Sequence, residues 1–381
     1  MIDLEGARAT FEGSTDGTVG LEEEFAILDA GTLGLVSRFE ELRDAAVAGD
    51  SGLRQSISGE LIASEIEIRS GRGQTLASAV AAQREYRRRL FALAAEHGVA
   101  LSATGTHPWA DYREQRIIDT DHYQRLDREL RYVVWRNNTF SLHVHVGVQG
   151  PDRAVRTCDR LRPVLPLLLA ISANSPYLDG QDSGLHSART VSFTRLFPRC
   201  GIPDAFGDWA TFADYVDFLV RTGSIVEFTQ VWWSIRPHVS FGTVEVRICD
   251  AQTSAAESEA LAALATACVL QAARDEDEGR SGAEVPGRLI EENLWRAMRW
   301  GLDGKLLDLE SGEQYPALEA VERLAEWTAP ARAEHGIELG SLVPNGAQRQ
   351  RRLIEAGVPM EEVFADATRE TRETYAAQVA V

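Results

Sequence analysis

The stretch Thr18–Ile27, TVGLEEEFAI, carries the pattern that the rest of the chain repeats. Side chains alternate between the two faces of a β-strand, so this stretch predicts a strand with one face that is apolar except for Glu23. The opposite face carries Gly20 and then two carboxylates, Glu22 and Glu24. Like charges side by side destabilise a strand unless a positive charge lies between them. A divalent cation such as Mg²⁺ meets that need, and a solvated edge strand is the alternative.

A second alternating run lies within Gln55–Arg69, QSISGELIASEIEIR. Its isoleucine-rich face alternates with a face that carries Glu65 and Glu67, which predicts another strand. Glu60 lies just before this run and out of register with Glu67. A single glutamate in such a position is more often a solvated strand residue than a ligand.

A third alternating segment, Asn137–Val148 (NNTFSLHVHVGV), contains two histidines. His143 and His145 share one face, and leucine and valine side chains occupy the other, which predicts a strand. An H-x-H pair is usually a surface feature or a chance transition-metal site, and contact with Mg²⁺ or phosphate is its rarer use.

The segment Val239–Asp250 (VSFGTVEVRICD) predicts a fourth strand. Aliphatic side chains occupy one face, and Glu245, Arg247 and Cys249 share the other. A glutamate and an arginine on one face commonly form an ion pair of little energetic value. Next to an acidic surface, the arginine is also suited to stabilise charge on a transferred phosphoryl group.

Together the four segments predict a sheet whose polar face combines several carboxylates, two imidazoles and a guanidinium. Removing this many like charges from water without counter-ions is strongly unfavourable. Several Mg²⁺ ions and a polyphosphate would balance them. Phosphoryl transfer uses this arrangement, because metal ions bridge phosphate oxygens while an arginine stabilises the transferred group.

The remaining segments read mainly as helices, with a short strand at Val99–Thr104 and an irregular stretch at Ser187–Gly207. Strands that carry polar chemistry come first and a helical block comes last, which predicts an α+β protein with a mainly antiparallel sheet. The acidic segment Asp275–Gly282 is the best candidate for a loop or local boundary. The predicted helices are Thr75–His97, Arg113–Arg136, Arg153–Ser172, Phe212–Arg221, Ser254–Arg274, Pro286–Trp300, Pro316–His335 and Gln348–Tyr375.

The bulk composition excludes several classes of protein. The 381 residues carry a net charge of −19, so a surface for duplex nucleic acid is not expected. Lys305 is the one lysine, which excludes a P-loop nucleotide site. The four cysteines form no C-x-x-C pair, and the longest apolar run, Val164–Ile171, is too short to span a bilayer. With no signal-peptide pattern at the N-terminus, the sequence predicts a soluble cytoplasmic protein with reduced thiols.

The motifs, taken as a set, resemble the carboxylate–amine ligase family, the YbdK-like glutamate–cysteine ligase type 2 group. The resemblance runs in order from about residue 18 to residue 306. The segments that carry it are TVGLEEEF, SGELIASEIEIRSG, NNTFSLHVHVGV, NSPYLDGQDSGLHSART…FPRCGIPDAFGDW, TVEVRICDAQTS and WRAMRWGLDGKL.

The resemblance implies a glutamine synthetase/guanido kinase-like catalytic fold. In this fold a mainly antiparallel sheet forms an active-site funnel with flanking helices, with ATP at one end and glutamate at the other. We accordingly expect residues 1–381 to form a single catalytic domain. Its core would span about residues 15–306, followed by a helical C-terminal block at about 307–381.

The resemblance also implies the reaction. The side-chain carboxylate of L-glutamate would attack the γ-phosphate of ATP to give γ-glutamyl phosphate. An amine, by default that of L-cysteine, would then displace phosphate and form the amide γ-glutamylcysteine. The expected cofactors are ATP and Mg²⁺, with Mn²⁺ as an alternative metal.

Roles for individual residues follow from the same resemblance. The matching positions comprise metal ligands, groups that act in phosphoryl transfer, and contacts to nucleotide or anion. The implied metal ligands are Glu22, Glu24, Glu60, Glu67, His143 and Glu245; the implied catalytic residues are Arg247 and Glu67; the implied nucleotide or anion contacts are His145, Arg247 and Arg189.

Two other functions remain open from the sequence. A guanidino-kinase-like phosphotransferase would use the same metal-binding face but make no amide. A non-catalytic ATP- or metal-binding protein has less reason to retain so repulsive a cluster. Tryptophans 295, 300 and 327 lie on apolar helices; packing in the core is their commoner use, and a homo-oligomer interface is the alternative that we carry forward.

Overall fold

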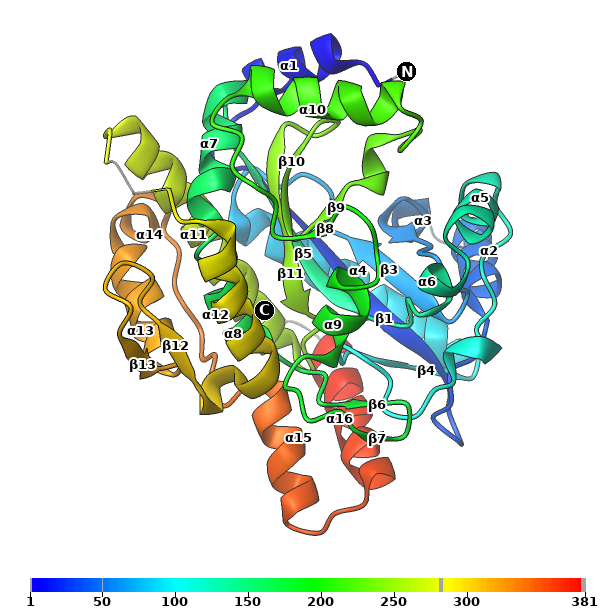
Figure 1. Cartoon of the computed structure of the whole chain (residues 1–381). Coiled ribbons are helices and arrows are strands. Elements are labelled where there is room, and N and C mark those ends of the chain that lie inside the picture. The colour runs from blue at the N-terminus through cyan, green and yellow to red at the C-terminus, as the bar shows by residue number, and fades with distance from the viewer. Residues whose placement is uncertain (1, 50, 281–283, 378–381) are drawn as a thin grey trace.

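A seven-stranded sheet forms the centre of the computed structural model, which describes residues 2–49, 51–280 and 284–377 (Figure 1). Every pairing among the described strands of this sheet is antiparallel, which confirms the predicted α+β class with a mainly antiparallel sheet. The strand order is β10-β11-β5-β1-β3-β2, and β4 also pairs with β1. The strands are β1 (Val19–Asp29), β2 (Ile57–Ser58), β3 (Glu65–Arg69), β4 (Val99–Ser102), β5 (Ser141–Gly147), β10 (Ile235–His238) and β11 (Thr243–Asp250).

One face of the sheet is covered by helices. The apolar side chains of the alternating strands lie on this face and pack against the helices in two buried clusters. Val19 and Leu21 of β1, for example, are 1% exposed. The alternation predicted from the sequence is therefore confirmed. The covering helices are α4 (Leu76–Glu96), α7 (Pro151–Leu161), α8 (Leu165–Ser172) and α11 (Ala255–Asp277).

Glu23, the one charged residue on the apolar face of β1, is buried among these helices. Its carboxylate accepts hydrogen bonds from Arg87 and Gln83 of α4 and from Ser258 of α11. The Arg87 Nε–Glu23 Oε2 distance is 2.6 Å, and Arg87 is 1% exposed. Because a buried carboxylate needs such partners, Glu23 joins the central strand to two covering helices.

Short elements border the opposite face of the sheet and leave its middle open. In Figure 1, α9 crosses in front of the sheet, and α5 and α6 stand beside it. These bordering elements are α5 (Asp121–Leu130), α6 (Tyr132–Trp135), α9 (Ala188–Thr194) and the 3-10 turn η2 (Phe228–Gln230).

The remaining elements surround this core. Helices α1 and α10 lie at one end of the molecule, and α15 and α16 lie at the other (Figure 1). The two-stranded sheets are β6 (Tyr177–Leu178) with β7 (Gln181–Asp182), β8 (Cys200–Gly201) with β9 (Trp232–Trp233), and β12 (Lys305–Leu307) with β13 (Gln314–Pro316). The other helices are α1 (Leu4–Glu12), α2 (Phe39–Gly49), α3 (Ser51–Ser56), η1 (Tyr112–Glu114), α10 (Trp209–Arg221), α12 (Gly287–Trp300), η3 (Gly301–Asp303), α13 (Glu319–Trp327), α14 (Ala329–His335), α15 (Gly346–Glu355) and α16 (Met360–Tyr375).

Several of the expected local structures are wrong in part. The segments Arg153–Ser172, Pro316–His335 and Gln348–Tyr375, each expected as one helix, are each divided into two helices. The segment Arg113–Arg136 is not one helix: α5 begins after the N-cap Thr120 and ends at Leu130, because the φ of 51° at Arg131 interrupts the helix. The segment Ser187–Gly207 is not wholly irregular, because Ser187 caps the helix α9. A side-chain N-cap bond explains both helix starts.

Cys249 also differs from expectation. The pairing of β11 with β5 shifts by one residue between Val246 and Cys249, as in a β-bulge. Cys249 therefore pairs with Leu142 on the helix-covered face, and it does not share the polar face of Glu245 and Arg247. A bulge adds one residue and so reverses the alternation beyond it.

The described part of the C-terminal third is mainly helical. The hairpin β12–β13 precedes the helices of the expected 307–381 block, which begin at Glu319. In the acidic segment Asp275–Gly282, α11 continues to Asp277, and residues 281–282 lie outside the described residues. Within the described ranges, none of the helices is long and apolar enough to cross a bilayer.

Candidate active site

The open face of the sheet carries the polar side chains that the sequence singled out. Most of them come from adjacent strands, where they are cross-strand neighbours. Neighbours on one face of an antiparallel sheet lie close enough for their side chains to interact. The pairs are Glu24 with Glu67, Glu22 with Arg69 and with His143, Gly20 with His145, and His145 with Glu245.

A cavity of about 520 Å³ lies over this face. It gathers residues that are more than 200 positions apart in the sequence. Glu60 joins it from the loop before β3, and Arg189 from α9. All nine residues predicted for the site line this cavity: Glu22, Glu24, Glu60, Glu67, His143, His145, Arg189, Glu245 and Arg247.

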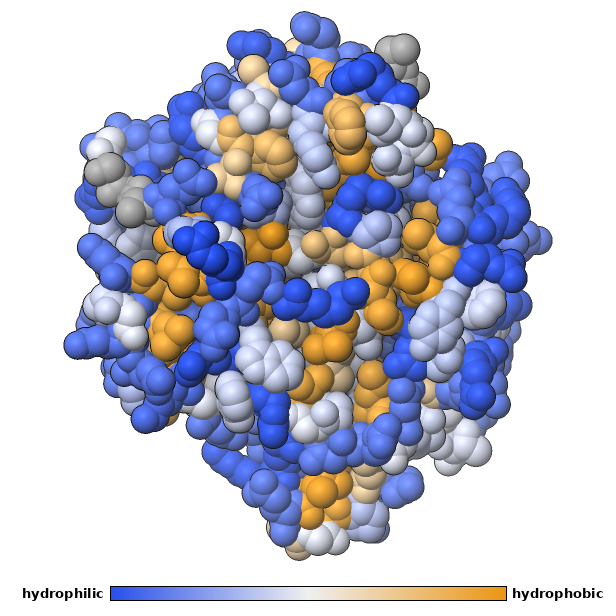
Figure 2. All heavy atoms as spheres, viewed as in Figure 1, coloured by the Kyte–Doolittle hydropathy of each residue, from blue (hydrophilic) through white to orange (hydrophobic). Residues whose placement is uncertain are grey.

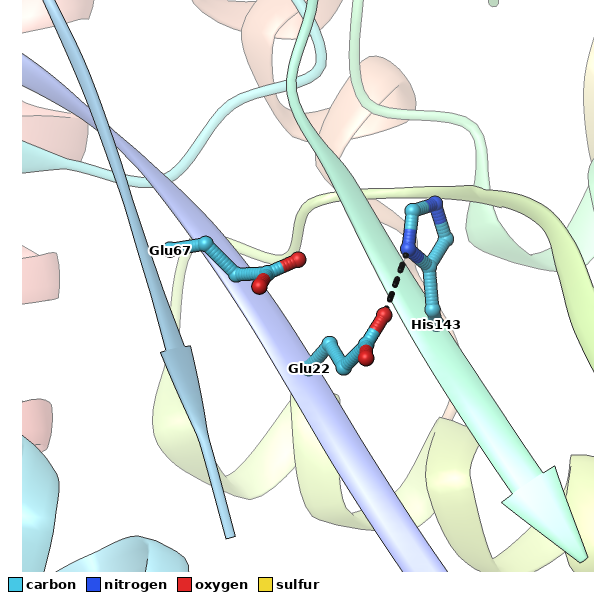
Figure 3. Close-up of side chains that lie close together, drawn as sticks. All are labelled: Glu22, Glu67 and His143. Carbon is cyan, nitrogen blue, oxygen red and sulfur yellow. Dashed lines mark hydrogen bonds and ion pairs between the residues drawn. The ribbon is translucent and has the colours of Figure 1, made fainter. Parts of the chain in front are cut away.

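Three overlapping groups of these side chains, among the described residues, offer ligand atoms within 4.8 Å of one another. Glu22 and Glu67 each belong to two of the groups, so neighbouring ions would share them. Figure 3 shows one group, in which Glu67 approaches Glu22 and His143 from the neighbouring strand β3. The groups are Glu22–Glu67–His143, Glu22–His145–Glu245 and Glu24–Glu60–Glu67.

His143 is oriented by Ser141, two residues earlier on the same strand. The Ser141 hydroxyl donates to Glu24 at 2.6 Å, so its oxygen is left to accept from Nε2–H of His143 at 2.8 Å. Burial, followed by the charge of Arg247, lowers the pKa of His143 and favours its neutral form. Nδ1 of that form is an acceptor that faces a Glu22 oxygen at 3.2 Å. Two acceptors that face each other suit a shared cation.

The acidic groups do not share one protonation behaviour. Burial and the nearby Glu24 and Glu22 raise the pKa of Glu60 to about 8. Burial and neighbouring carboxylates likewise raise the pKa of Glu65 and Glu67 well above the usual value. Crowded carboxylates favour their neutral forms unless cations compensate them.

Glu22 behaves in the opposite way. Burial acts to raise its pKa, but the charge of His145 and the adjacent imidazole of His143 hold that pKa well below the usual value. The pKa of His145 shifts in the opposite direction. Burial acts to lower this pKa, but the charges of Glu22 and Glu245 raise it above the usual value. The two residues thus stabilise each other's charged forms.

Glu245 lies between two arginines. Arg236 on β10 and Arg247 on β11 both donate to its carboxylate, and all three residues are buried or nearly so. Burial acts to raise the pKa of Glu245, but Arg236, Arg247 and His145 hold it well below the usual value. The guanidinium of Arg247 is thereby fixed at the cavity wall.

Arg189 holds the bulged part of β11. Its Nη1 and Nη2 donate to the backbone carbonyls of Ile248 and Arg247, both at 3.1 Å, and Nη1 lies 3.6 Å from Asp250. Its Nε is buried and has no hydrogen-bond partner in the described part of the chain. Arg189 therefore lines the cavity while positioning the strand that carries Arg247.

The cavity wall opposite the charged sheet is apolar. In Figure 2, hydrophobic side chains gather in the middle of the visible face, between α9 and α6. Tyr123 adds a hydroxyl group that donates to the carbonyl of Gly59 at 2.6 Å. The apolar residues that line the cavity are Leu61, Leu126, Val134, Phe193, Phe197 and Trp232.

A family model, glutamate–cysteine ligase family 2 (GCS2), matches residues 18–377. The chain belongs to glutamate–cysteine ligase family 2. It is therefore an enzyme of the class that forms carbon–nitrogen bonds. The glutamate–cysteine ligase of Natronomonas pharaonis is 37% identical over 362 residues, covering 93% of this chain and 95% of that protein. A Rubrobacter xylanophilus protein with the provisional name glutamate–cysteine ligase 2-2 is 40% identical over 363 residues, covering 94% and 93%.

Solved structures share the fold of this glutamate–cysteine ligase family 2 protein. The glutamate–cysteine ligase of Francisella tularensis, solved with AMP, has a TM-score of 0.64 at 12% identity, covering 96% of this chain and 90% of that one. The bifunctional glutathione synthetase of Pasteurella multocida has the same TM-score and identity, covering 97% of this chain and 54% of that one. The expected fold class is confirmed.

The residues present fit divalent cations. The group Glu24–Glu60–Glu67 offers oxygen atoms alone, the donor type that Mg²⁺ and Mn²⁺ prefer. The other two groups add one imidazole each, which Mn²⁺ also accepts. Buried Oε2 of Glu65 and Nε2 of His145 have no hydrogen-bond partner among the described residues, which also suits a bound ion.

Sequence reasoning missed several residues of the site. Glu65 lines the cavity beside Glu67, although its alternation was visible in the sequence. Ser141 and Arg236 also contribute, and each lies on a strand next to residues that the sequence did single out. Glu65 and Ser141 could have been found because each shares a strand face with a residue that was singled out, Glu67 on β3 and His143 on β5. Arg236 precedes the predicted fourth strand, and no pattern in the sequence marked it.

Proposed function

We propose that this protein catalyses the ATP-dependent ligation of L-glutamate to an amine, with L-cysteine as the default acceptor. The reaction would proceed through γ-glutamyl phosphate and release ADP and phosphate. The observation that carries this proposal is the set of three overlapping ligand groups beside Arg247 in one cavity. The names of the family and its relatives support glutamate and cysteine as substrates. The AMP in a structure of the same fold supports an adenine nucleotide.

The acid- and histidine-lined sheet would hold the metal. Mg²⁺ or Mn²⁺, when bound, supplies the positive charge that lets a carboxylate approach a triphosphate. Because Glu22 and Glu67 each belong to two of the three ligand groups, these groups would fix the positions of the ions relative to one another. The residues that would hold the ions are Glu22, Glu24, Glu60, Glu67, His143 and Glu245.

Arg247 would stabilise the charge on the transferred phosphoryl group. Its guanidinium is held by Glu245 and by the strand that Arg189 anchors, so it needs little reorganisation during the reaction. His145, beside Glu22 and Glu245, would contact nucleotide phosphate. The unpartnered Nε of Arg189 leaves one donor for an anionic substrate.

The experiment that tests the function is a measurement of ADP release from ATP–Mg²⁺ with L-glutamate, with and without each of a panel of amines that includes L-cysteine. The expected result is ADP release that requires both glutamate and one amine, with the matching amide detected by mass. ADP formed with a phosphorylated guanidino compound would instead establish a phosphotransferase. Tight nucleotide binding without turnover of any carboxylate would overturn the ligase. A cytoplasmic location and a homo-oligomeric state stay predictions from the sequence.

A further inference from the structure

A second cavity of about 550 Å³ lies on the other side of the metal-binding residues. It shares Glu22, His145 and Phe241 with the first cavity, so the two are adjacent chambers over one sheet. Its floor is the beginning of β1, and α3 and the segment after β3 contribute to its walls. A ligand that extends from one chamber to the other would pass over the residues that both chambers share, Glu22 among them.

The two chambers differ in charge. Several carboxylates and arginines line the first chamber. Among the residues that line the second, Glu22 is the single acid, and neutral polar side chains such as Gln55, Ser56 and Tyr86 predominate over two arginines. An amino acid substrate needs charged partners for its ammonium and carboxylate groups, whereas a nucleoside needs neutral donors and acceptors. The second chamber suits the nucleoside.

Gly20 forms part of the floor of the second chamber, and the protein itself gives no reason for a glycine there. Its backbone is not in the left-handed region. An added Cβ would meet the Cβ of His145 at 3.5 Å and the carbonyl of Gly71 at 3.6 Å, which are ordinary contacts. Glycine in the interior of a strand is less stable than alanine, and it often marks the close approach of a ligand. The missing side chain leaves room in the chamber.

Phe241 faces the same space from the turn between β10 and β11. Its side chain is 56% exposed, an unusual setting for a large aromatic residue. The ring stacks on His238 with centroids 4.2 Å apart, and its edge approaches His145. Gly242, at φ +65°, fixes the turn, and its carbonyl accepts a hydrogen bond from Ser14 at 2.7 Å. A fixed, exposed aromatic ring beside a cavity is a stacking surface for a planar group.

We propose that Gly20 and Phe241 form the binding slot for the base of ATP. The base would lie over the bare backbone of Gly20 and against the ring of Phe241. This position directs the triphosphate across Glu22 onto the metal-binding residues and leaves the first chamber for glutamate and the amine. The inference rests on the proposed function, because it assigns one chamber to a substrate of that reaction.

The test compares a ligand that contains the nucleoside with one that lacks it. The non-hydrolysable analogue adenylyl imidodiphosphate and inorganic tripolyphosphate are each titrated calorimetrically, with Mg²⁺, into the full chain. The variants are Gly20→Ala, which adds a methyl group to the slot, and Phe241→Ala, which removes the stacking surface. Gly34→Ala and Phe218→Ala are matched controls. At Gly34 an added Cβ also meets its nearest neighbour at 3.5 Å, and Phe218 on α10 is 49% exposed.

We expect both slot variants to bind the analogue about tenfold or more weakly, because a methyl group overfills a fitted site and a lost stacking contact weakens base binding. Tripolyphosphate affinity should stay within about twofold of wild type in all four variants, since no contact to the phosphates is altered. The melting temperature of Gly20→Ala without ligand should equal or exceed that of wild type, since alanine favours the strand. Both controls should bind the two ligands as wild type does.

The outcomes separate this inference from the function on which it rests. If the wild type binds the analogue and Gly20→Ala and Phe241→Ala bind it equally well, the slot is wrong while the ligase proposal stands. If the wild type binds tripolyphosphate as tightly as the analogue, the nucleoside has no site and the slot is overturned. If the wild type binds no analogue at all, the ATP-dependent function fails, and the slot fails with it.

Discussion

Glu24 lies at the centre of the crowded acidic groups. Its carboxylate accepts hydrogen bonds from the backbone and hydroxyl of Ser141, and it belongs to a ligand group with Glu60 and Glu67. Replacing Glu24 with glutamine keeps the shape of the side chain but removes one negative charge. That change relieves repulsion in the protein without ligand and weakens its hold on a cation.

We therefore expect Glu24→Gln to keep or raise the melting temperature without ligand and to lose the increment that ATP–Mg²⁺ adds. The turnover should fall by roughly 100-fold or more, because one electrostatic contact to the reacting groups is removed. Thermal denaturation with and without ATP–Mg²⁺ measures the first effect, and ADP release the second. The control is Glu85→Gln on α4. An unchanged ligand increment in Glu24→Gln would remove Glu24 from the metal site.

Ser141 orients His143, a proposed metal ligand, without being one of the predicted ligands itself. Its hydroxyl bridges Glu24 and His143, so Ser141→Ala should leave the ring of His143 without its orienting partner, whereas Glu24 keeps the bond from the backbone amide. We expect Mn²⁺ affinity and kcat/KM each to fall by roughly 10- to 100-fold, as is typical when a partner of a metal ligand is removed. The fold should persist, because only one hydroxyl is lost.

Titration with Mn²⁺, followed by electron paramagnetic resonance, measures the affinity of Ser141→Ala. Ser183→Ala, whose hydroxyl bonds the carbonyl of Pro176 away from the cavity, is the control. Wild-type Mn²⁺ affinity in Ser141→Ala would show that His143 needs no orienting partner.

Individual site residues were predictable where acidic, histidine or arginine side chains recurred along one face of a strand. Glu22, Glu24, His143 and Arg247 stood out because an acid- and histidine-rich face is unusual for a solvated sheet. Arg236 was not predictable, since its partner Glu245 lies nine positions away on another strand. Pairing across strands is a property of register, which one sequence does not reveal.

At the scale of elements, β1 is held between the strands that flank it and the helices behind it. The buried pair of Glu23 and Arg87 joins it to α4, and Arg87 also contacts Glu259 of α11 at 2.8 Å. Its guanidinium stacks over the ring of Tyr375 in α16, with 4.8 Å to the centroid. One arginine thus connects four elements of the fold.

Arg87→Met should lower the free energy of unfolding by about 3–5 kcal/mol, because it leaves the carboxylate of Glu23 buried without its ionic partner. The double variant Glu23→Gln/Arg87→Met should recover part of this loss, since the uncompensated charge is gone. Urea unfolding measures both. Arg88→Met, on the same helix but exposed, should change stability by about 0.5 kcal/mol or less. Additive effects of the two substitutions would contradict the pairing.

Helices and strands were predicted well where the periodicity of apolar residues and the capping residues indicated the same boundaries. The helix Thr75–His97 is present as α4, with Thr75 as its N-cap and Gly98 just beyond its end. The predictions failed where one residue changed the local geometry, as at Arg131 and at the bulge before Cys249. A bulge depends on how two strands pair, so the alternation of polar and apolar residues in one strand does not predict it.

At the scale of the whole molecule, His107 connects parts that are distant in sequence. Its Nε2–H donates to the carbonyl of Leu33 at 2.7 Å, and its Nδ1 accepts from the backbone amides of Trp109 and Ala110. The ring packs against Phe364 of the C-terminal helix α16. Burial lowers the pKa of His107 to about 4, because the charged imidazolium is disfavoured away from water.

This shift makes stability depend on pH. Above pH 6.5, the usual pKa of the group, His107 is neutral in the folded and unfolded chains, and its contribution is complete. As the pH falls towards 4, the unfolded chain binds a proton that the folded chain does not, so the contribution is lost. The loss should be at most about 3 kcal/mol over this window.

Urea unfolding of the wild type and of His107→Gln at several values between pH 4 and 7.5 checks this expectation. The variant should be less stable at pH 7.5, because its ring contacts are gone, and its stability should fall less steeply towards acid. His335→Gln, at an exposed position, should keep the wild-type slope. A variant slope equal to that of the wild type would assign the pH dependence to other groups.

The overall architecture was predictable because the motifs resembled a known family over most of the chain. The sequence also indicated the antiparallel sheet, through strands that alternate polar and apolar residues. It did not indicate the second chamber, which depends on how the turn that carries Phe241 lies beside Gly20. Relations of this kind arise from packing between segments more than 200 residues apart, which no local pattern encodes.

The strand order has a consequence for how the chain acquires its site during refolding. β1 bonds to β5, more than 100 residues later, and β5 bonds to β11, about 100 residues later again. A chain of the first 150 residues already holds Glu22, Glu24 and both histidines, but it has neither Glu245 nor Arg247. Because distant closures of this kind are slow, recovery of nucleotide binding should lag behind recovery of helical signal. Nucleotide binding would then report the closing of β11 onto β5.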